Sequence, residues 1–288
     1  MQTTISNNFI SVNILHKGAE LCSVKNKSGI EFIWQADGKF WPRHAPILFP
    51  IVGKLKDFSY QHKRSKYTLP QHGFARDKNF FLKSVSDDFV VFYLNSDVET
   101  QISYPFEFEL IVSYGLIKNK VIVEYKVSNY GSELMPFSIG AHPGFCCPIA
   151  PGEKFEDYKL QFEQVENLDA HLLEGGLFSG KTEKCLNNSN EIRLNENTFS
   201  KDALVLEGAK SKYVTLQSTR SAHAVKVAIE GFPYLGLWSK PGAPFVCIEP
   251  WFGLSDHVDA NGVLQDKKGI ILLEPKKEFS CSYSIEVI

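Results

Sequence analysis

The sequence lacks a long hydrophobic run and a dominant charge. Its longest apolar stretches, residues 45–52 and 269–273, are bounded or interrupted by Pro or Lys. They fall far short of the roughly 20 apolar residues that a bilayer-spanning helix needs, so we expect no membrane partner. The 288 residues carry 31 Lys and Arg against 33 Asp and Glu, a formal net charge of −2. Because no basic excess is present to neutralise phosphates, we expect no nucleic-acid partner either.

A secretory leader and paired cysteines are also missing. Residues 1–8 (MQTTISNN) contain neither a basic segment nor an apolar core, so we expect a cytoplasmic protein. The cysteines are scattered, with no Cys-x-x-Cys pair, which argues against a disulfide framework or a structural zinc site. We expect buried free thiols at Cys22, Cys146, Cys147, Cys185, Cys247 and Cys281.

Helix signals are sparse, whereas strand signals recur along the whole chain. In residues 106–114 and 121–127 apolar residues alternate with polar ones, the period-two pattern of half-buried strands. The polar link at residues 118–120 predicts that these two runs form an antiparallel hairpin. The best helical candidate, residues 168–173, is too short to define a fold.

Further short runs are rich in β-branched and aromatic residues and are bounded by turn residues. They lie at residues 9–15, 21–24, 30–34, 89–94, 213–217, 224–229, 234–238, 245–248 and 282–287. No linker, repeat or shift in composition divides the chain. We therefore predict an all-β protein with one domain over residues 1–288, a large antiparallel β-sandwich in preference to a barrel.

Four segments contain residues that folding alone does not require. In residues 43–54 (RHAPILFPIVGK) two prolines interrupt an apolar run and a basic residue stands at each end, which predicts an irregular segment. Residues 71–77 (QHGFARD) place His72 directly before a glycine, with Arg76 four residues later. Each segment alone is also consistent with an ordinary core-packing loop or a turn.

The other two segments are residues 140–145 (GAHPGF) and 245–257 (FVCIEPWFGLSDH). His142 precedes a proline, which restricts its backbone to extended conformations. Glu249 ends an apolar strand and precedes Pro250 and Trp251. Since Glu is rarely buried without a partner, this carboxylate is expected at a cleft mouth or bonded to a specific group, although a solvent-facing strand end is equally compatible. The Trp251 indole offers a flat face on which sugar C–H groups pack.

Two histidines and a glutamate suit proton transfer at an alcohol or hemiacetal, where one group removes a proton while another supplies one. The segments, in their order, resemble the aldose 1-epimerase (galactose mutarotase-like) family. They are PILFP, HGFAR, GAHPGF, KDAL and CIEPW, and the HGFAR corner is similar to that of the LacX-like proteins and the hexose-6-phosphate epimerases. The resemblance extends over residues 9–288.

This resemblance implies a large β-sandwich enzyme, an isomerase that interconverts α and β anomers of a hexose or hexose phosphate without a cofactor. Glu249 would be the general base at the anomeric hydroxyl, and His142 the general acid at the ring oxygen. His72 would hold a sugar oxygen, Arg76 would steady His72 or the sugar, and Asp202 would bind hydroxyls away from the reacting carbon. We expect burial beside Trp251 to raise the pKa of Glu249, and a small upward shift to keep His142 protonated.

The family's arginine contact from the first loop has two candidates here, Arg43 and Lys54, which differ in donor geometry. Together with Lys56 and Arg76 they could instead bind a phosphate. Two other functions fit the same residue types. One is a carbohydrate-binding protein without catalysis. The other is a metalloenzyme whose ligands come from His72, His142, Glu249 and His257, although none of these are spaced as a ligand pair within one element.

Overall fold

The computed structural model describes residues 1–288, and β-strands dominate it. One large sheet has the strand order β4-β12-β20-β19-β16-β14-β17-β18-β22-β10-β9-β8-β7, with β13 paired to β20 and β15 to β14. Its strands are β4 (Ile47–Leu48), β7 (Phe81–Val85), β8 (Phe89–Asn95), β9 (Phe108–Ile117), β10 (Lys120–Asn129), β12 (Ile139–Ala141), β13 (Gly144–Cys146), β14 (Tyr158–Glu174), β15 (Leu177–Arg193), β16 (Leu204–Glu207), β17 (Tyr213–Ser218), β18 (Ala224–Ala228), β19 (Tyr234–Trp238), β20 (Phe245–Phe252) and β22 (Glu278–Val287).

Smaller sheets and short helices complete the fold. A three-stranded sheet is formed by β1 (Gln2–Ser6), β2 (Ile10–Leu15) and β3 (Leu21–Asn26), and two-stranded pairs by β5 (Ser59–His62) with β6 (Ser65–Thr68) and by β11 (Met135–Phe137) with β21 (Ile271–Leu273). The helices are α1 (Val98–Ser103) and the 3₁₀ turns η1 (Lys56–Phe58), η2 (Ala75–Asp77), η3 (Phe155–Asp157) and η4 (Leu264–Asp266).

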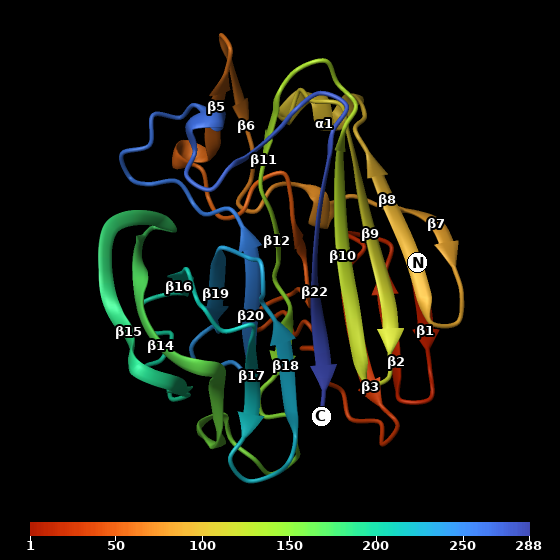
Figure 1. Ribbon diagram of the computed structural model, residues 1–288, viewed down its shortest axis with the longest axis vertical. Helices are drawn as coiled ribbons and strands as arrows, with labels where there is room; N and C mark the ends of the chain where they lie inside the picture. The colour runs from red at the N-terminus through yellow and green to blue at the C-terminus, as the bar shows by residue number, and fades with distance from the viewer.

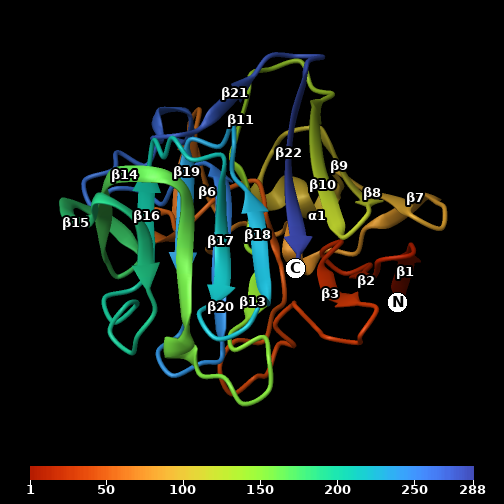
Figure 2. The ribbon, with the colours of Figure 1, turned by 60° about the horizontal axis from the view of Figure 1, so that its bottom comes forward.

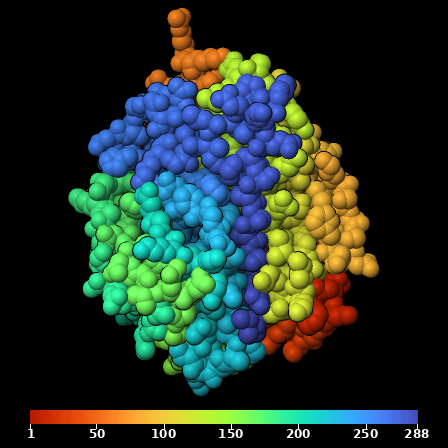
Figure 3. All heavy atoms as spheres, in the orientation of Figure 1, coloured from red at the N-terminus to blue at the C-terminus, as the bar shows by residue number.

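The C-terminal strand β22 joins the two halves of the large sheet. It pairs with β18 on one side and with β10 on the other (Figures 1 and 2). In Figure 3 it is the dark blue band between the cyan and the yellow-green surfaces, and the orange tip of the β5–β6 hairpin projects at the top. The sequence prediction of an all-β, antiparallel architecture is thereby confirmed.

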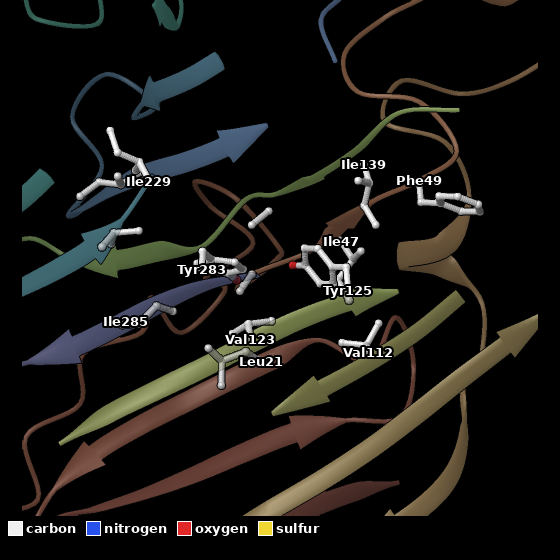
Figure 4. Packing of buried hydrophobic residues seen from close by; sticks show 14 of the residues in the cluster. Leu21, Ile47, Phe49, Val112, Val123, Tyr125, Ile139, Ile229, Tyr283 and Ile285 are labelled. Carbon is white, nitrogen blue, oxygen red and sulfur yellow. The ribbon is translucent and has the colours of Figure 1, made fainter. Parts of the chain in front are cut away.

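The apolar face of this sheet packs against the three-stranded sheet. Leu21 of β3 lies beside Val123 of β10 (Figure 4), and both belong, with Val112 of β9, to one core cluster of 63 buried residues. The Tyr114 hydroxyl donates a hydrogen bond of 2.6 Å to the carbonyl of Ala19, which ties the turn after β2 to β9. Burial of these faces is the main source of the sandwich's stability.

The predicted hairpin is present as β9 and β10, and their register pairs Val121 with Leu116 and Val127 with Leu110. Two smaller expectations were wrong. Residues 168–173, the best helical candidate, are part of β14, because pairing with β15 places His171 opposite Thr182. Residues 30–34 form only isolated bridges. The α-helix α1 instead begins after Asp97, whose carboxylate accepts from the Thr100 N–H at 2.6 Å.

No helix of the structure has the length and apolar character that crossing a membrane requires.

A buried ion pair fixes the loops above β20. Lys267 Nζ lies 2.7 Å from Asp256 Oδ1, and the two side chains are only 2% and 5% exposed. The other carboxylate oxygen of Asp256 accepts from the Lys56 N–H at 2.9 Å. Removing one partner of such a pair strands a charge in the interior, so this contact is required for local order.

We expect Lys267→Met to lower the free energy of unfolding by about 3–5 kcal/mol, because it leaves the Asp256 carboxylate buried without its counter-charge. The matched control is Lys268→Met. Lys268 pairs with Glu207 at the same 2.7 Å, but the side chains are 59% and 42% exposed, and such surface pairs contribute about 0–1 kcal/mol. Urea unfolding of both variants measures the difference. Equal losses would contradict this prediction.

Candidate functional site

A cavity of about 240 Å³ opens between β20, β16 and the loop after β6. Six residues singled out in the sequence line it: Glu249, His142, His72, Arg76, Asp202 and Trp251. They come from segments far apart in the chain, and the sheet order brings them together. Figure 1 shows β19 and β20 side by side, with the β14–β15 hairpin curving beyond them.

Strand β20 does not stop before Glu249, as the sequence had suggested, but continues to Phe252. Glu249 is therefore an interior strand residue, only 1% exposed. Pro250 is tolerated because the neighbouring strand is interrupted beside it. The Ile248 N–H points to the Pro143 carbonyl at 3.4 Å, and the Pro250 nitrogen faces the same side two residues later. Opposite Pro250, the neighbouring segment between β12 and β13 is not paired with β20. The backbone N–H that proline lacks would therefore have had no carbonyl partner in the sheet.

Two glycines make room for the Trp251 indole. A Cβ atom at Gly140 would lie 2.6 Å from Trp251 Cδ1, and one at Gly236 would lie 2.5 Å from its outer ring. The indole thus lies flat across β12 and β19, and its Nε1 donates to the Ala141 carbonyl at 3.1 Å. The packing fixes one face of the cavity as a rigid aromatic surface.

His142 sits at the interruption between β12 and β13 and faces Glu249. Its Nε2 lies 3.2 Å from Glu249 Oε2. The imidazole stacks on the Trp41 ring with centroids 4.8 Å apart and meets Trp238 edge to face at 5.8 Å. This aromatic enclosure leaves His142 only 8% exposed and determines the orientation of its ring.

Burial shifts the two pKa values in opposite directions. Desolvation raises the pKa of Glu249 well above its ordinary value, and the polar N–H of the nearby Trp251 indole opposes the shift. Desolvation lowers the pKa of His142 to about 3, and the charge of Arg76 adds to the effect. The expected rise at Glu249 matches this direction, whereas the upward shift expected for His142 was wrong. Burial thus favours the uncharged form of both side chains.

His72 is fixed by a backbone donor. The Gly53 N–H donates to His72 Nδ1 at 3.0 Å, so the neutral imidazole carries its proton on Nε2. Burial, together with the charges of His142, Arg76 and Arg43, holds the pKa of His72 well below its ordinary value. The ring centroid lies 5.6 Å from that of His142. His72 is therefore a neutral hydrogen-bond donor beside the pair.

The HGF sequence is explained by a close backbone approach. His72 has φ 66° and Gly73 has φ 69°, a backbone region that is uncommon for residues other than glycine, although Asn, Asp and His adopt it more often than the rest. A Cβ at Gly73 would lie 2.2 Å from the Phe49 carbonyl oxygen. Glycine is required at this point so that the loop can pass over residues 49–50 and bring His72 to the cavity.

The basic residues do not gather at one point. Arg76 lines the cavity, and its Nη2 donates to the Gln71 carbonyl at 2.6 Å. Arg43 and Lys54 do not line it. Arg43 pairs with Asp77 at 3.0 Å, and Lys54 Nζ donates to the Gly175 carbonyl at 2.8 Å. Arg76 is thus the one Lys or Arg that lines the cavity. The other three candidates from the sequence, Arg43, Lys54 and Lys56, do not line it.

The sequence reading missed three parts of the cavity wall. Trp41 and Trp238 enclose His142, and the end of the β14–β15 hairpin contributes Leu173 and Phe178. The available signal was the rarity of tryptophan, which occurs 4 times in the chain. Trp41 lies just before the segment of residues 43–54, and Trp238 lies shortly before the segment of residues 245–257.

Of the four residues considered as metal ligands from the sequence, only His142 and Glu249 belong to the cluster of possible ligands that the structure shows. His257 is not among the cavity residues, and its side chain is 44% exposed. Instead, His142, Cys247 and Glu249 offer donor atoms that all lie within 4.8 Å of one another, and all three residues are buried.

Comparisons with known proteins show the family of the chain. A family model described as aldose 1-epimerase matches residues 1–270. The protein LacX of Lactococcus lactis subsp. lactis is 36% identical over 298 residues and covers 100% of both chains. A galactose mutarotase related enzyme from Lactobacillus acidophilus is 36% identical with a TM-score of 0.97, covering 100% of this chain and 97% of that chain. A galactose mutarotase-like protein from Lactobacillus casei is 32% identical with a TM-score of 0.94, covering 100% of both. The chain belongs to the aldose 1-epimerase family.

Proposed function

We propose that the protein is a mutarotase, an isomerase that interconverts the α and β anomers of a hexose by opening and closing the sugar ring. The observation that carries this proposal is the pair formed by His142 Nε2 and Glu249 Oε2, 3.2 Å apart in the wall of a cavity that also presents Trp251. Mutarotation needs one group to take the proton of the anomeric hydroxyl and another to protonate the ring oxygen. The pair provides both groups.

The pair holds one proton, and this allows it to work in either direction. In one assignment Glu249 is the base at the anomeric hydroxyl and a protonated His142 is the acid, as the family resemblance implies. With the proton on Glu249, as burial favours, the carboxyl group donates to the ring oxygen and His142 takes the hydroxyl proton. Either transfer breaks the ring C–O bond and forms the aldehyde. Rotation about C1–C2 and closure with the roles exchanged give the other anomer.

The other cavity residues bind the sugar. His72 donates its Nε2 proton to a sugar oxygen, Arg76 donates to a second, and Asp202 accepts from hydroxyls away from C1. Trp251 offers the face on which the C–H groups pack. Asp202 has φ 94°, and its backbone conformation turns this loop towards the cavity that Ala203 and Val205 also line.

The substrate that fits this lining best is an unphosphorylated hexose. Arg76 is the one Lys or Arg side chain in the cavity, and its guanidinium already donates to the Gln71 carbonyl. Glu249 and Asp202 lie on the same wall. A phosphate dianion is bound well where several cations or a bidentate arginine are free, which is not the case here.

Glu249→Gln tests the acid–base pair. We expect it to reduce the acceleration of mutarotation by 10²- to 10⁴-fold, because the amide cannot exchange a proton. Decay of optical rotation of a fresh anomer measures the rate, and thermal unfolding checks that the variant is folded. Glu230→Gln, at a side chain 66% exposed, serves as the control. If Glu249→Gln kept full activity, the pair would not be the catalyst. A wild type that binds sugars without accelerating mutarotation would identify a binding protein.

His72→Asn removes the hydrogen-bond donor at Nε2 while keeping the conformation of the loop that carries residue 72. Asn tolerates a positive φ and can accept from the Gly53 N–H, but it has no group at the position of Nε2. We expect a loss of about 10²-fold in kcat, typical of removing one preorganised donor, with an unfolding temperature close to that of the wild type. His72→Gln, whose amide reaches the Nε2 position, should recover part of the rate. Unchanged kcat in His72→Asn would contradict the assigned role.

Phosphate preference is tested by anomer-exchange NMR with free and 6-phosphorylated hexoses. We expect a higher kcat/KM for the free sugar, because the cavity offers a phosphate no cation beyond Arg76. Arg76→Lys should lower kcat/KM for both sugars, since a point charge replaces the planar guanidinium. A preference for the phosphorylated sugar would contradict the proposed unphosphorylated substrate.

A further inference from the structure

Behind the acid–base pair lies a thiol that mutarotation does not use. Cys247 and Glu249 project from the same face of β20, because alternate residues of a strand share a face. Gly144, which pairs with Cys247 across the β13–β20 ladder, follows closely after His142. One donor atom from each of Cys247, Glu249 and His142 lies within 4.8 Å of the other two.

Two polar atoms of this cluster lack a hydrogen-bond partner although they are buried. They are His142 Nδ1, which has no polar neighbour assigned to it, and Glu249 Oε2, whose contact with His142 Nε2 at 3.2 Å does not have hydrogen-bond geometry; the side chains are 10% and 1% exposed. Buried polar atoms are almost always hydrogen-bonded, and an unpartnered one needs an explanation such as a ligand. Because Glu249 and His142 also line the cavity, a ligand entering from solvent can reach both.

The donor set selects the ligand. Thiolate sulfur and imidazole nitrogen favour Zn²⁺, whereas Mg²⁺ and Ca²⁺ prefer sites built from oxygen alone. Zinc takes donors at about 2.0–2.3 Å in a tetrahedron, so the three side chains would close in by about 1 Å. The cavity provides the fourth position for a water molecule.

We propose that His142, Cys247 and Glu249 form a Zn²⁺ site and that the bound ion inhibits the enzyme by occupying the acid–base pair. The Cys247 thiol and the Glu249 carboxyl group release their protons to solvent as they coordinate, and no redox step is involved. Zinc and the sugar then exclude one another, since both need Glu249 and His142. Inhibition rests on the proposed function, whereas metal binding does not.

Metal binding is tested with Co²⁺, which reports its ligands by absorption. We expect the wild type to show a thiolate-to-cobalt charge-transfer band in the near ultraviolet, and Cys247→Ser to lose it. Cys185→Ser is the matched control, because Cys185 is a partly buried free thiol outside the cluster, and it should keep the band. No band in the wild type, or an unchanged band in Cys247→Ser, would overturn the site.

A second measurement needs no variant and so does not depend on the folding of Cys247→Ser. X-ray absorption of the wild type loaded with one equivalent of Zn²⁺ should show one sulfur at about 2.3 Å and nitrogen or oxygen neighbours at about 2.0 Å. A shell without sulfur would place the ion elsewhere and refute the proposal.

Inhibition is measured separately by optical rotation. We expect Zn²⁺ to compete with the sugar, a chelator to restore the rate, and Mg²⁺ to have no effect. The inhibition constant in Cys247→Ser, taken relative to that variant's own rate, should rise at least tenfold. Cobalt binding without mutarotase activity would leave the site standing and remove the proposed function. Activity with no zinc inhibition and no cobalt band would do the reverse.

Discussion

The site depends on one costly feature, a carboxyl group placed in the interior of a β-strand. Glu249 is 1% exposed and its neighbours along β20 are apolar. A charged carboxylate in such surroundings is strongly disfavoured, so burial keeps the group protonated and directs it to the nearest basic atom, His142 Nε2 at 3.2 Å. Few arrangements satisfy this requirement, and the rest of the site is built around the one observed.

The surrounding sheet shows how that arrangement is held. The break between β12 and β13 provides His142 and also accommodates Pro250. Gly140 and Gly236 leave space for the Trp251 indole on either side of Glu249. Glu249 lies within β20, and His142 lies in the two-residue break between β12 and β13, so paired strands hold the backbone on both sides of the proposed acid–base pair. The proposed sugar-binding residues His72 and Asp202 come from loops. Precise placement of reacting groups on rigid elements is what proton transfer within hydrogen-bond distance requires.

Local patterns in the sequence predicted most of the strands and picked out six of the residues that line the cavity, but they did not predict the surroundings of these residues. Alternation of apolar and polar residues predicted the β9–β10 hairpin, and an isolated Glu in an apolar run identified Glu249. The direction of the His142 pKa shift was missed, because it depends on enclosure by Trp41 and Trp238, which approach from distant strands and loops. Arg43 and Lys54 have the residue type of a sugar or phosphate contact, but Asp77 and the Gly175 carbonyl hold them. The partners of Arg43 and Lys54 lie 34 and 121 residues away in the sequence, so no local sequence pattern predicts these contacts.

An uncharged pair that shares one proton suits a reaction whose two directions are chemically alike. Ring opening from either anomer removes a proton at one oxygen and delivers one at the other, and ring closure reverses the transfer. Because ring closure returns each proton to the group that gave it up during opening, the proposed pair is ready for the next turnover without exchanging protons with solvent. The proposed sugar and the proposed zinc ion both require Glu249 and His142, so the same buried pair would serve the reaction and its inhibition.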